Sequence, residues 1–300
     1  SSSSSSSDQP WMLLVSGLGG GSEDSYVQSM CVEAAKRNWR VAVLNMRGCG
    51  NSPVISPRFF SAMRGSLEDV RETVRYMREE LAGPRAPIAA LGWSNGATIV
   101  NNYAAQQGAF DAKERVDLAA TMCCPFDMPM ADRGFRKPFS RMVYDRALTR
   151  KLVSKIKENI EVFEELPVVS LEGKRVELDL ERLLGARTIR EIDAELTCKT
   201  FDYPTVDAYY ADSSCNQRLK DVEIPLLMVS AIDDPLIPDS CIPYEEARRN
   251  DNLMLVTTRH GGHLGWVDEA ASARGDGRRW CSDWIERTVL NHLDAALHLA

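Results

Sequence analysis

Ser94 lies at the centre of GWSNG, residues 92–96, which fits the pattern G-x-S-x-G. A serine hydroxyl becomes a useful nucleophile when an imidazole accepts its proton and a carboxylate orients that imidazole. An apolar run from Pro87 precedes the motif, and helically spaced apolar residues follow it as far as Gln106. A strand that turns abruptly into a helix would lift the serine oxygen clear of a sheet and place it beside free backbone N–H groups. The motif therefore predicts a serine nucleophile that needs a base and an acid from elsewhere in the chain.

Two histidines, His260 and His263, follow the last predicted strand, and either could serve as the base. We favour His263, because the two glycines before it allow its loop to approach a neighbour closely. An H-x-x-H metal pair is an alternative use of these residues, but no further ligands stand out nearby in the sequence. The remaining histidines, His292 and His298, belong to a predicted terminal helix and are interpreted as surface or packing residues.

The carboxylate candidates are Asp233 and Asp234, which follow the predicted strand 224–231. Either of them could point at the base, and Asp127, after an earlier predicted strand, is an outside candidate. Serine first, aspartate next and histidine last is the chain order of the α/β-hydrolase arrangement. Three such residues on three strand-end loops are much harder to obtain by chance than GWSNG alone.

A glycine-rich segment, residues 17–22, follows the first predicted strand. It lacks both the G-K-[ST] sequence and the G-x-G-x-x-G spacing of nucleotide-binding loops, so we do not expect it to bind phosphate. Its backbone N–H near Leu18 or Gly19 would instead face the serine across adjacent strand ends. The segment therefore predicts the second donor of an oxyanion hole, the site that stabilises the charge on a reacting carbonyl oxygen.

These loops must be positioned by a sheet, and apolar runs alternate with helical patterns along most of the chain. This alternation predicts an α/β fold with a doubly wound, mostly parallel sheet, whose sites collect beyond the carboxyl ends of its strands. From about 128 to 220 the alternation stops, and charged helical patterns predict a cap insertion that covers the site with an aromatic tract at 201–214. The predicted strands are 11–16, 40–46, 87–92, 116–124, 224–231 and 253–258, and the predicted helices begin near 24, 67, 95 and 280.

Composition narrows the class of protein. The 300 residues carry a net charge of −7, which gives no sign of a nucleic-acid-binding surface. Eight irregularly spaced cysteines without a C-x-x-C pair favour buried free thiols in a reducing compartment over a zinc site or a disulfide framework. No apolar run approaches the ~18 residues that a membrane-spanning helix needs. Residues 1–10 begin with seven serines and are interpreted as a low-complexity tail or linker, which leaves 11–300 as one domain.

The chain resembles the α/β-hydrolase superfamily, and within it the embryogenesis-associated and YheT-like abhydrolases. The pieces that carry the resemblance run from residue 17 to 269: GLGGGSEDSY, NMRGCGNSP, GWSNGA, CPFDM, TIREID, DAYYADSS, SAIDDPLIP and HGGHLGWVDE. The resemblance implies an esterase or lipase that cleaves acyl esters, such as acylglycerols or phospholipids, without a cofactor or a metal. It implies a catalytic triad of Ser94, Asp234 and His263, and an oxyanion hole made by the backbone N–H groups of Leu18 and Asn95.

Three departures from that family stand out. Ser16 precedes the glycine loop where relatives have histidine, and Asn95 follows the nucleophile where they usually have leucine, which affects the expected acyl pocket. Relatives also begin with extra N-terminal strands, so we expect a sheet edge that is bare or covered by something outside this chain.

The predicted function is hydrolysis of a carboxylic ester, an acyl lipid or another apolar acyl ester, by way of an acyl-enzyme on Ser94. The alternatives are a ligand-binding or scaffold protein with little turnover, and an amidase or thioesterase that uses the same triad. We expect no nucleic-acid partner and allow for peripheral membrane contact. The expected location is cytoplasmic, or membrane-associated through segments outside this chain.

Overall fold

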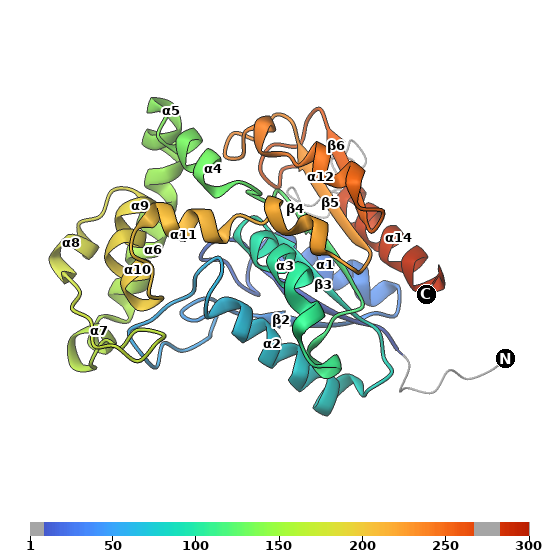
Figure 1. Ribbon diagram of the computed structural model, residues 1–300, viewed down its shortest axis with the longest axis horizontal. Helices are drawn as coiled ribbons and strands as arrows, with labels where there is room; N and C mark the ends of the chain where they lie inside the picture. Colours follow the sequence, from blue (N-terminus) through green and yellow to red (C-terminus); the bar gives the residue numbers. More distant parts are fainter. Residues whose placement is uncertain (1–8, 267–282, 300) are drawn as a thin grey trace, which may run out of the picture.

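Six parallel strands form one sheet in the order β2-β1-β3-β4-β5-β6, which confirms the predicted fold class (Figure 1). The computed structural model describes residues 9–266 and 283–299. The predicted tail, 1–10, lies outside the described residues except for its last two positions, and so does the start of the predicted terminal helix. The strands are β1 (Trp11–Val15), β2 (Arg40–Leu44), β3 (Ile88–Trp93), β4 (Leu118–Met122), β5 (Leu226–Ala231) and β6 (Leu253–Thr258).

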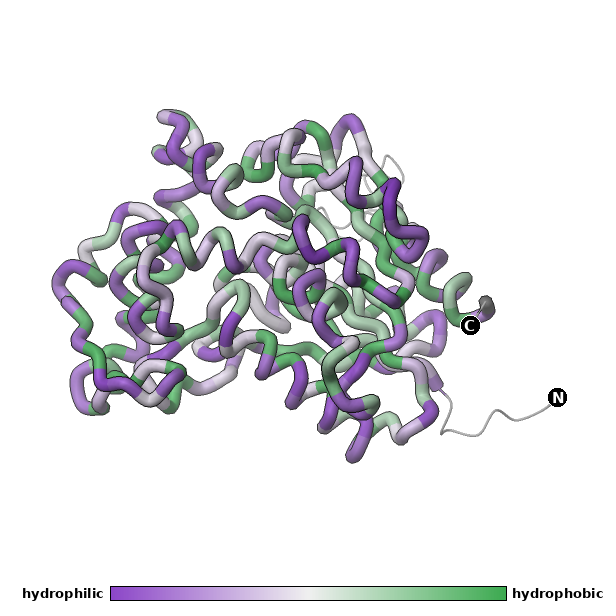
Figure 2. Tube along the Cα trace, in the orientation of Figure 1, coloured by the Kyte–Doolittle hydropathy of each residue, from purple (hydrophilic) through white to green (hydrophobic). Residues whose placement is uncertain are grey.

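Helices cover both faces of the sheet, which explains why every residue of β3, β4 and β5 is buried. In β1, Leu13 packs in the core beneath α2 and α3, whereas the neighbouring Met12 packs in the core beneath α1 and α14. Figure 2 shows the hydrophobic residues gathered along these strands and the hydrophilic ones on the outer helices. The covering helices are α1 (Ser25–Lys36), α2 (Ser66–Tyr76) with the π-helical η1 (Met77–Ala82), α3 (Asn95–Gln106), α12 (Tyr244–Arg249) and α14 (Asp283–Leu299), with short 3-10 turns η2 (Gln107–Ala109), η3 (Ala112–Glu114) and η7 (Asp239–Cys241).

Between β4 and β5 the chain forms a group of helices at one side of the sheet, to the left in Figure 1. Residues 128–221, called the helical segment below, pack against the loop between β2 and α2, because Ile156 and Leu183 share a hydrophobic cluster with Val54 and Phe59. Whether 128–220 is a separate cap insertion stays a prediction. Its helices are α4 (Met128–Phe135), α5 (Pro138–Ser140), η4 (Arg141–Asp145), α6 (Arg146–Glu158), α7 (Ile160–Glu165), α8 (Leu180–Leu184), α9 (Ile189–Ile192), η5 (Asp193–Thr197), α10 (Cys198–Thr200), α11 (Val206–Ser213) and η6 (Asn216–Asp221).

The two edge strands of the sheet are β2 and β6, and the first strand is not one of them. Trp11 of β1 pairs with Arg40 on one side and Ile88 on the other, so β1 is interior. Among residues 9–266 and 283–299, β2 pairs with β1 alone, and its residues are only half-buried or exposed. None of the helices in this part of the chain is long and apolar enough to cross a membrane.

Gly96 allows the first turn of α3 to touch the end of β1. A Cβ at this position would lie 2.2 Å from the carbonyl oxygen of Val15 and 2.4 Å from that of Ser16. Since both contacts are with backbone, neither can be relieved by rotating a side chain.

We therefore expect Gly96→Ala to lower the free energy of unfolding by about 2 to 3 kcal/mol, as overpacked sites do. Gly108→Ala is the matched control, because its Cβ would meet nothing closer than 3.5 Å. Urea unfolding followed by circular dichroism measures both. An unchanged midpoint for Gly96→Ala would show that the two elements can separate without cost.

Candidate active site

Ser94 occupies a strained turn between β3 and α3. Its backbone has φ 52° and ψ −117°, a conformation that residues with a side chain rarely adopt. The turn is held because the Ser94 N–H donates to the carbonyl of Met122 on the neighbouring strand, at 2.9 Å. The strain is thus maintained by the sheet, and it projects the hydroxyl from the carboxyl edge of the strands into a pocket.

His263 joins Ser94 to Asp234. Its Nε2 lies 3.0 Å from the Ser94 Oγ, and its Nδ1 lies 2.8 Å from the Asp234 Oδ2. The other carboxylate oxygen of Asp234 accepts the N–H groups of Leu236 and Ile237, which fix its orientation. The Asp234 side chain is 2% exposed and the His263 side chain 16%. With Nδ1–H donating to this buried carboxylate, Nε2 is free to accept the serine proton.

Asp233 and His260 form a second, outer pair. The Asp233 Oδ2 lies 3.2 Å from the Nδ1 of His260, whose side chain is 89% exposed. Its Oδ1 accepts the N–H of Gly262 at 2.8 Å, and this bond lowers the pKa of the carboxyl group. Asp234 thus bonds the backbone of its own turn, whereas Asp233 holds the histidine loop.

Asp127 lies outside this arrangement. Its carboxylate accepts the N–H of Met130 at 2.8 Å and caps α4. A side chain occupied in this way is a helix cap and not a partner of the histidine.

Leu18 and Asn95 both line the pocket beside Ser94. In residues 9–266 and 283–299, neither of their backbone N–H groups donates to a protein acceptor. Asn95 is the first residue of α3, where helical N–H groups have no intrahelical partner. Two free donors therefore border the space in front of the serine.

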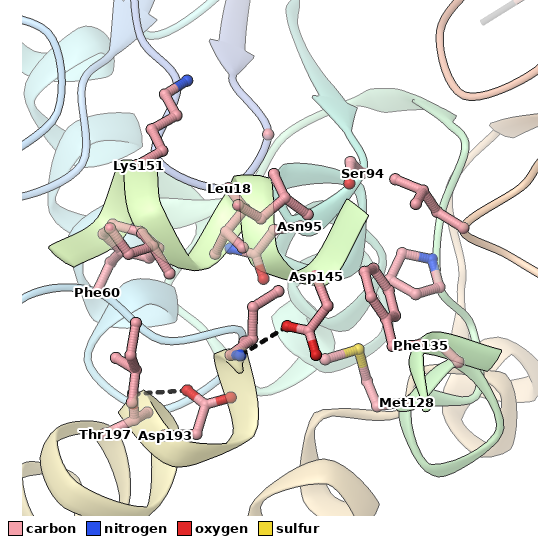
Figure 3. A pocket seen from close by; sticks show the side chains of 18 of the residues that line it. Leu18, Phe60, Ser94, Asn95, Met128, Phe135, Asp145, Lys151, Asp193 and Thr197 are labelled. Atoms are coloured by element: carbon pink, nitrogen blue, oxygen red, sulfur yellow. Dashed lines mark hydrogen bonds between the residues drawn. The ribbon is translucent and has the colours of Figure 1, made fainter. Parts of the chain in front are cut away.

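The pocket extends from Ser94 to the helical segment and holds a cavity of about 250 Å³ (Figure 3). Most of its wall is apolar, with Phe60, Met128 and Phe135 among the lining side chains. The aromatic tract contributes less than we expected. Tyr209 and Tyr210 reach the pocket, whereas Phe201 and Tyr203 are buried in the core of the helical segment.

The sequence matches the family model for the alpha/beta hydrolase fold over residues 10–270. The chain belongs to the α/β-hydrolase fold family. Among similar proteins are embryogenesis-associated protein EMB8 of Picea glauca, 34% identical over 96% of this chain, and phospholipase ABHD3 of Mus musculus, 32% identical over 87%. A monoacylglycerol lipase of Saccharomyces cerevisiae is 27% identical over 92% of this chain. The chain spans 58%, 59% and 58% of the lengths of these three relatives, in that order.

Solved structures of α/β-hydrolases superpose on the same fold. An esterase from Pyrococcus furiosus covers 96% of this chain and is itself covered to 83%, with a TM-score of 0.59 at 13% identity. Est1E from Butyrivibrio proteoclasticus, solved with ferulic acid, covers 97% and is covered to 91%, with a TM-score of 0.57 at 12% identity. At these identities the likeness concerns the fold alone.

Sequence patterns gave no sign of a role for Tyr26. Its hydroxyl accepts the N–H of Gly17 at 3.1 Å and donates to the carboxylate of Asp24 at 2.9 Å. Asp24 occupies the N-cap position of α1, but its side chain makes no capping bond and instead also accepts the N–H of Gly21. Tyr26 and Asp24 therefore hold the glycine loop of this α/β-hydrolase, whereas the buried hydroxyl of Ser16 has no hydrogen-bond partner in the described part of the chain.

Cys123 lies directly behind the histidine loop. It has φ 51°, and its sulfur accepts the N–H of Leu264 at 3.4 Å and lies 3.8 Å from the carbonyl oxygen of Gly262. Burial raises the pKa of this thiol well above its usual range. The sequence predicted only a buried free thiol, and a cysteine next to another cysteine gives no signal of this role.

Metal ligation is the alternative use of the same side chains. Cys123, Asp234 and His263 place their ligand atoms within 4.8 Å of one another, the one such cluster that we find within 9–266 and 283–299. Both ring nitrogens of His263 already face Asp234 and Ser94. His260 points to Asp233, so the H-x-x-H pair does not converge on one site. The arrangement fits activation of a hydroxyl better than ligation of an ion.

Two buried carboxylates, Asp145 and Asp193, line the wall of the pocket formed by the helical segment (Figure 3). Asp145 accepts the N–H of Ile189 at 2.8 Å. Asp193 accepts the hydroxyls of Thr197 and Tyr210, both at 2.8 Å. Burial nevertheless dominates and raises the pKa of Asp193 to about 6.

We expect Asp193 to make stability depend on pH. Its pKa is higher in the folded state than in the unfolded chain, so the folded state binds this proton more tightly and loses stability as the pH rises from about 4 to about 6. Asp193→Asn removes this titration. The difference in unfolding free energy, variant minus wild type, should rise by about 1 to 3 kcal/mol between pH 4 and pH 7. Urea unfolding at each pH measures it.

Asp221→Asn serves as the matched control, because this exposed carboxylate lies at the end of η6. A difference between wild type and Asp193→Asn that stays constant with pH would contradict the raised pKa.

Proposed function

We propose that the protein is a serine carboxylic-ester hydrolase that forms an acyl-enzyme on Ser94. The observation that carries the proposal is the continuous chain of contacts from the Ser94 Oγ through both nitrogens of His263 to the buried Asp234. A serine nucleophile that is activated by a histidine and a carboxylate uses these three groups in this geometry. Membership of a family with phospholipase and lipase relatives supports it.

In the proposed mechanism His263 accepts the Ser94 proton while the serine oxygen attacks the ester carbonyl. The negative charge moves to the carbonyl oxygen, where the N–H groups of Leu18 and Asn95 stabilise it. The C–O bond to the alcohol then breaks, and His263 returns the proton to the departing alkoxide. Water, activated in turn by His263, hydrolyses the acyl-serine and releases the acid.

The proposed substrates are acyl lipids or other apolar acyl esters. Apolar side chains such as Phe60, Met128 and Leu152 dominate the pocket wall and suit an acyl chain. Two of the similar proteins are named for phospholipid and monoacylglycerol cleavage. Asn95 adds an amide group to the wall beside the nucleophile, where it would select among acyl groups.

A fluorophosphonate probe should label Ser94, because the probe reacts with serines that a neighbouring base activates. Ser94→Ala and His263→Ala should abolish labelling, located by peptide mass spectrometry, and lower ester turnover by about 10³-fold or more. His260→Ala is the matched control and should label normally, since that imidazole is exposed and faces away from Ser94.

A folded protein that binds small esters but takes up no probe would contradict the proposal and favour a ligand-binding role. Matched ester, thioester and amide substrates then separate the three hydrolytic activities. We expect the ester to be cleaved fastest.

The two neighbouring aspartates provide a second comparison. Asp234→Asn removes the carboxylate that orients His263, so kcat should fall by about 10³ to 10⁴-fold. Asp233→Asn weakens the bonds to the Gly262 N–H and to His260 but leaves the bond between Asp234 and His263, so its effect should stay within roughly tenfold. Steady-state hydrolysis of a soluble ester measures both, and equal losses would show that the histidine loop, not the buried carboxylate, limits the reaction.

A further inference from the structure

One long helix of the helical segment presents two different faces. It comprises α5, η4 and α6 in unbroken succession from Pro138 to Glu158 (Figure 1). Its inner face contributes Leu148, Leu152 and Ile156 to the pocket. Its outer face exposes Phe139 and Met142, at 63% and 66%, with the partly exposed Val143 beside them.

These exposed side chains are grouped by helical spacing. Positions 139, 142 and 143 are three and four residues apart in the sequence, and Arg146 and Arg150 follow at the same intervals beyond the π-helical turn η4. Among the large apolar side chains of the described residues, only Ile55 is more exposed than Met142 and Phe139. Exposed apolar side chains that lie together mark interaction sites more often than single ones do. The outer face is therefore an amphipathic strip with an apolar end and a cationic end.

The same stretch carries a strong positive charge in an acidic protein. Residues 133–157 contain nine Lys or Arg side chains and one carboxylate, Asp145, although the whole chain has a net charge of −7. Asp145 is buried, and Arg136 pairs with Asp132. The other eight cations form no ion pair within the described residues. All of them except Lys155 are exposed, although Lys151 also lines the pocket, so most of this charge is in contact with solvent.

We propose that this outer face, the strip from Phe139 to Arg150 with the cations around it, docks on an anionic lipid bilayer. Apolar side chains enter the boundary between headgroups and acyl chains, while neighbouring Lys and Arg side chains attract anionic headgroups. In Figure 1, α5 projects from the body of the protein, so a flat surface can reach it.

Docking would also bring the pocket to its substrate. The helix that carries the strip forms part of the pocket wall on its opposite side, so the pocket would lie next to the bilayer. This step rests on the proposed function, whereas the binding of the strip to lipid does not.

The test uses the full chain with Ser94→Ala, which prevents hydrolysis, and measures co-sedimentation with vesicles. Phosphatidylcholine vesicles that contain about 30% phosphatidylserine should bind roughly tenfold more protein than phosphatidylcholine vesicles, and added salt should weaken the binding. Phe139→Ser with Met142→Ser, and separately Arg146→Glu with Arg150→Glu, should each lower binding roughly tenfold.

Matched controls place the same changes elsewhere on the surface. Tyr76→Ser with Met254→Ser alters two exposed apolar residues on other elements, and Arg85→Glu with Arg249→Glu reverses two exposed cations. Both should bind vesicles as the parent does. When the same surface variants are made in the protein that keeps Ser94, all of them should hydrolyse a soluble short-chain ester at the parental rate, because none of the changed residues lines the pocket.

Lack of binding to the anionic vesicles, or equal losses in strip and control variants, would overturn the proposal. A second result would also overturn the proposal: heparin abolishes binding, but Phe139→Ser with Met142→Ser leaves it unchanged. That result would point to an acidic macromolecule as the partner. Vesicle binding without probe labelling of Ser94 would reject the proposed hydrolysis and leave the docking surface standing, so the two failures can be told apart.

Discussion

The approach of α3 to the end of β1 is the contact on which the site depends. Gly96 brings the backbone of the helix against the carbonyls of Val15 and Ser16, and no residue with a side chain could take its place without displacing one of the two elements. This contact keeps the turn tight enough to hold Ser94 at a positive φ. The strained turn in turn aims the hydroxyl out of the sheet and leaves the Asn95 N–H without an intrahelical acceptor.

A parallel sheet then gathers the remaining groups. Since all six strands run the same way, the loops after β1, β3, β5 and β6 end at one edge, and side chains far apart in sequence meet there. Two adjacent carboxylates on the loop after β5 contact different groups on the loop after β6. Asp234 bonds the imidazole of His263, while Asp233 bonds the Gly262 N–H and so holds the loop that carries this imidazole. Below the loop, the sulfur of Cys123 accepts the N–H of Leu264.

The helical segment has one surface that lines the pocket and another that faces outward. Inward, apolar side chains and the hydrogen-bonded carboxylates of Asp145 and Asp193 form the pocket wall, and every bond to those carboxylates comes from the segment itself. Outward, Arg141, Arg146 and Arg150 form no ion pair in the described part of the chain, and Phe139 and Met142 stay exposed beside them. Burial of both carboxylates makes the wall of the pocket sensitive to pH, whereas the outer face keeps its charge across the physiological range because lysine and arginine do not titrate there.

The sequence by itself determined the sheet and predicted the turn at Ser94, because apolar runs and glycine spacing are local signals, and it favoured His263 over His260 as the base. Local signals could not decide whether Asp127 contacts the histidine. They also could not choose between Asp233 and Asp234 as its partner, since adjacent residues on one loop differ only in where the folded backbone points them. The hydrogen bonds of Tyr26 to the glycine loop likewise depend on packing between distant segments, and so does the burial of Phe201 and Tyr203 away from the pocket. Only the tertiary structure decided these points, because a side chain's partner is set by which elements fold against it and not by its neighbours in the chain.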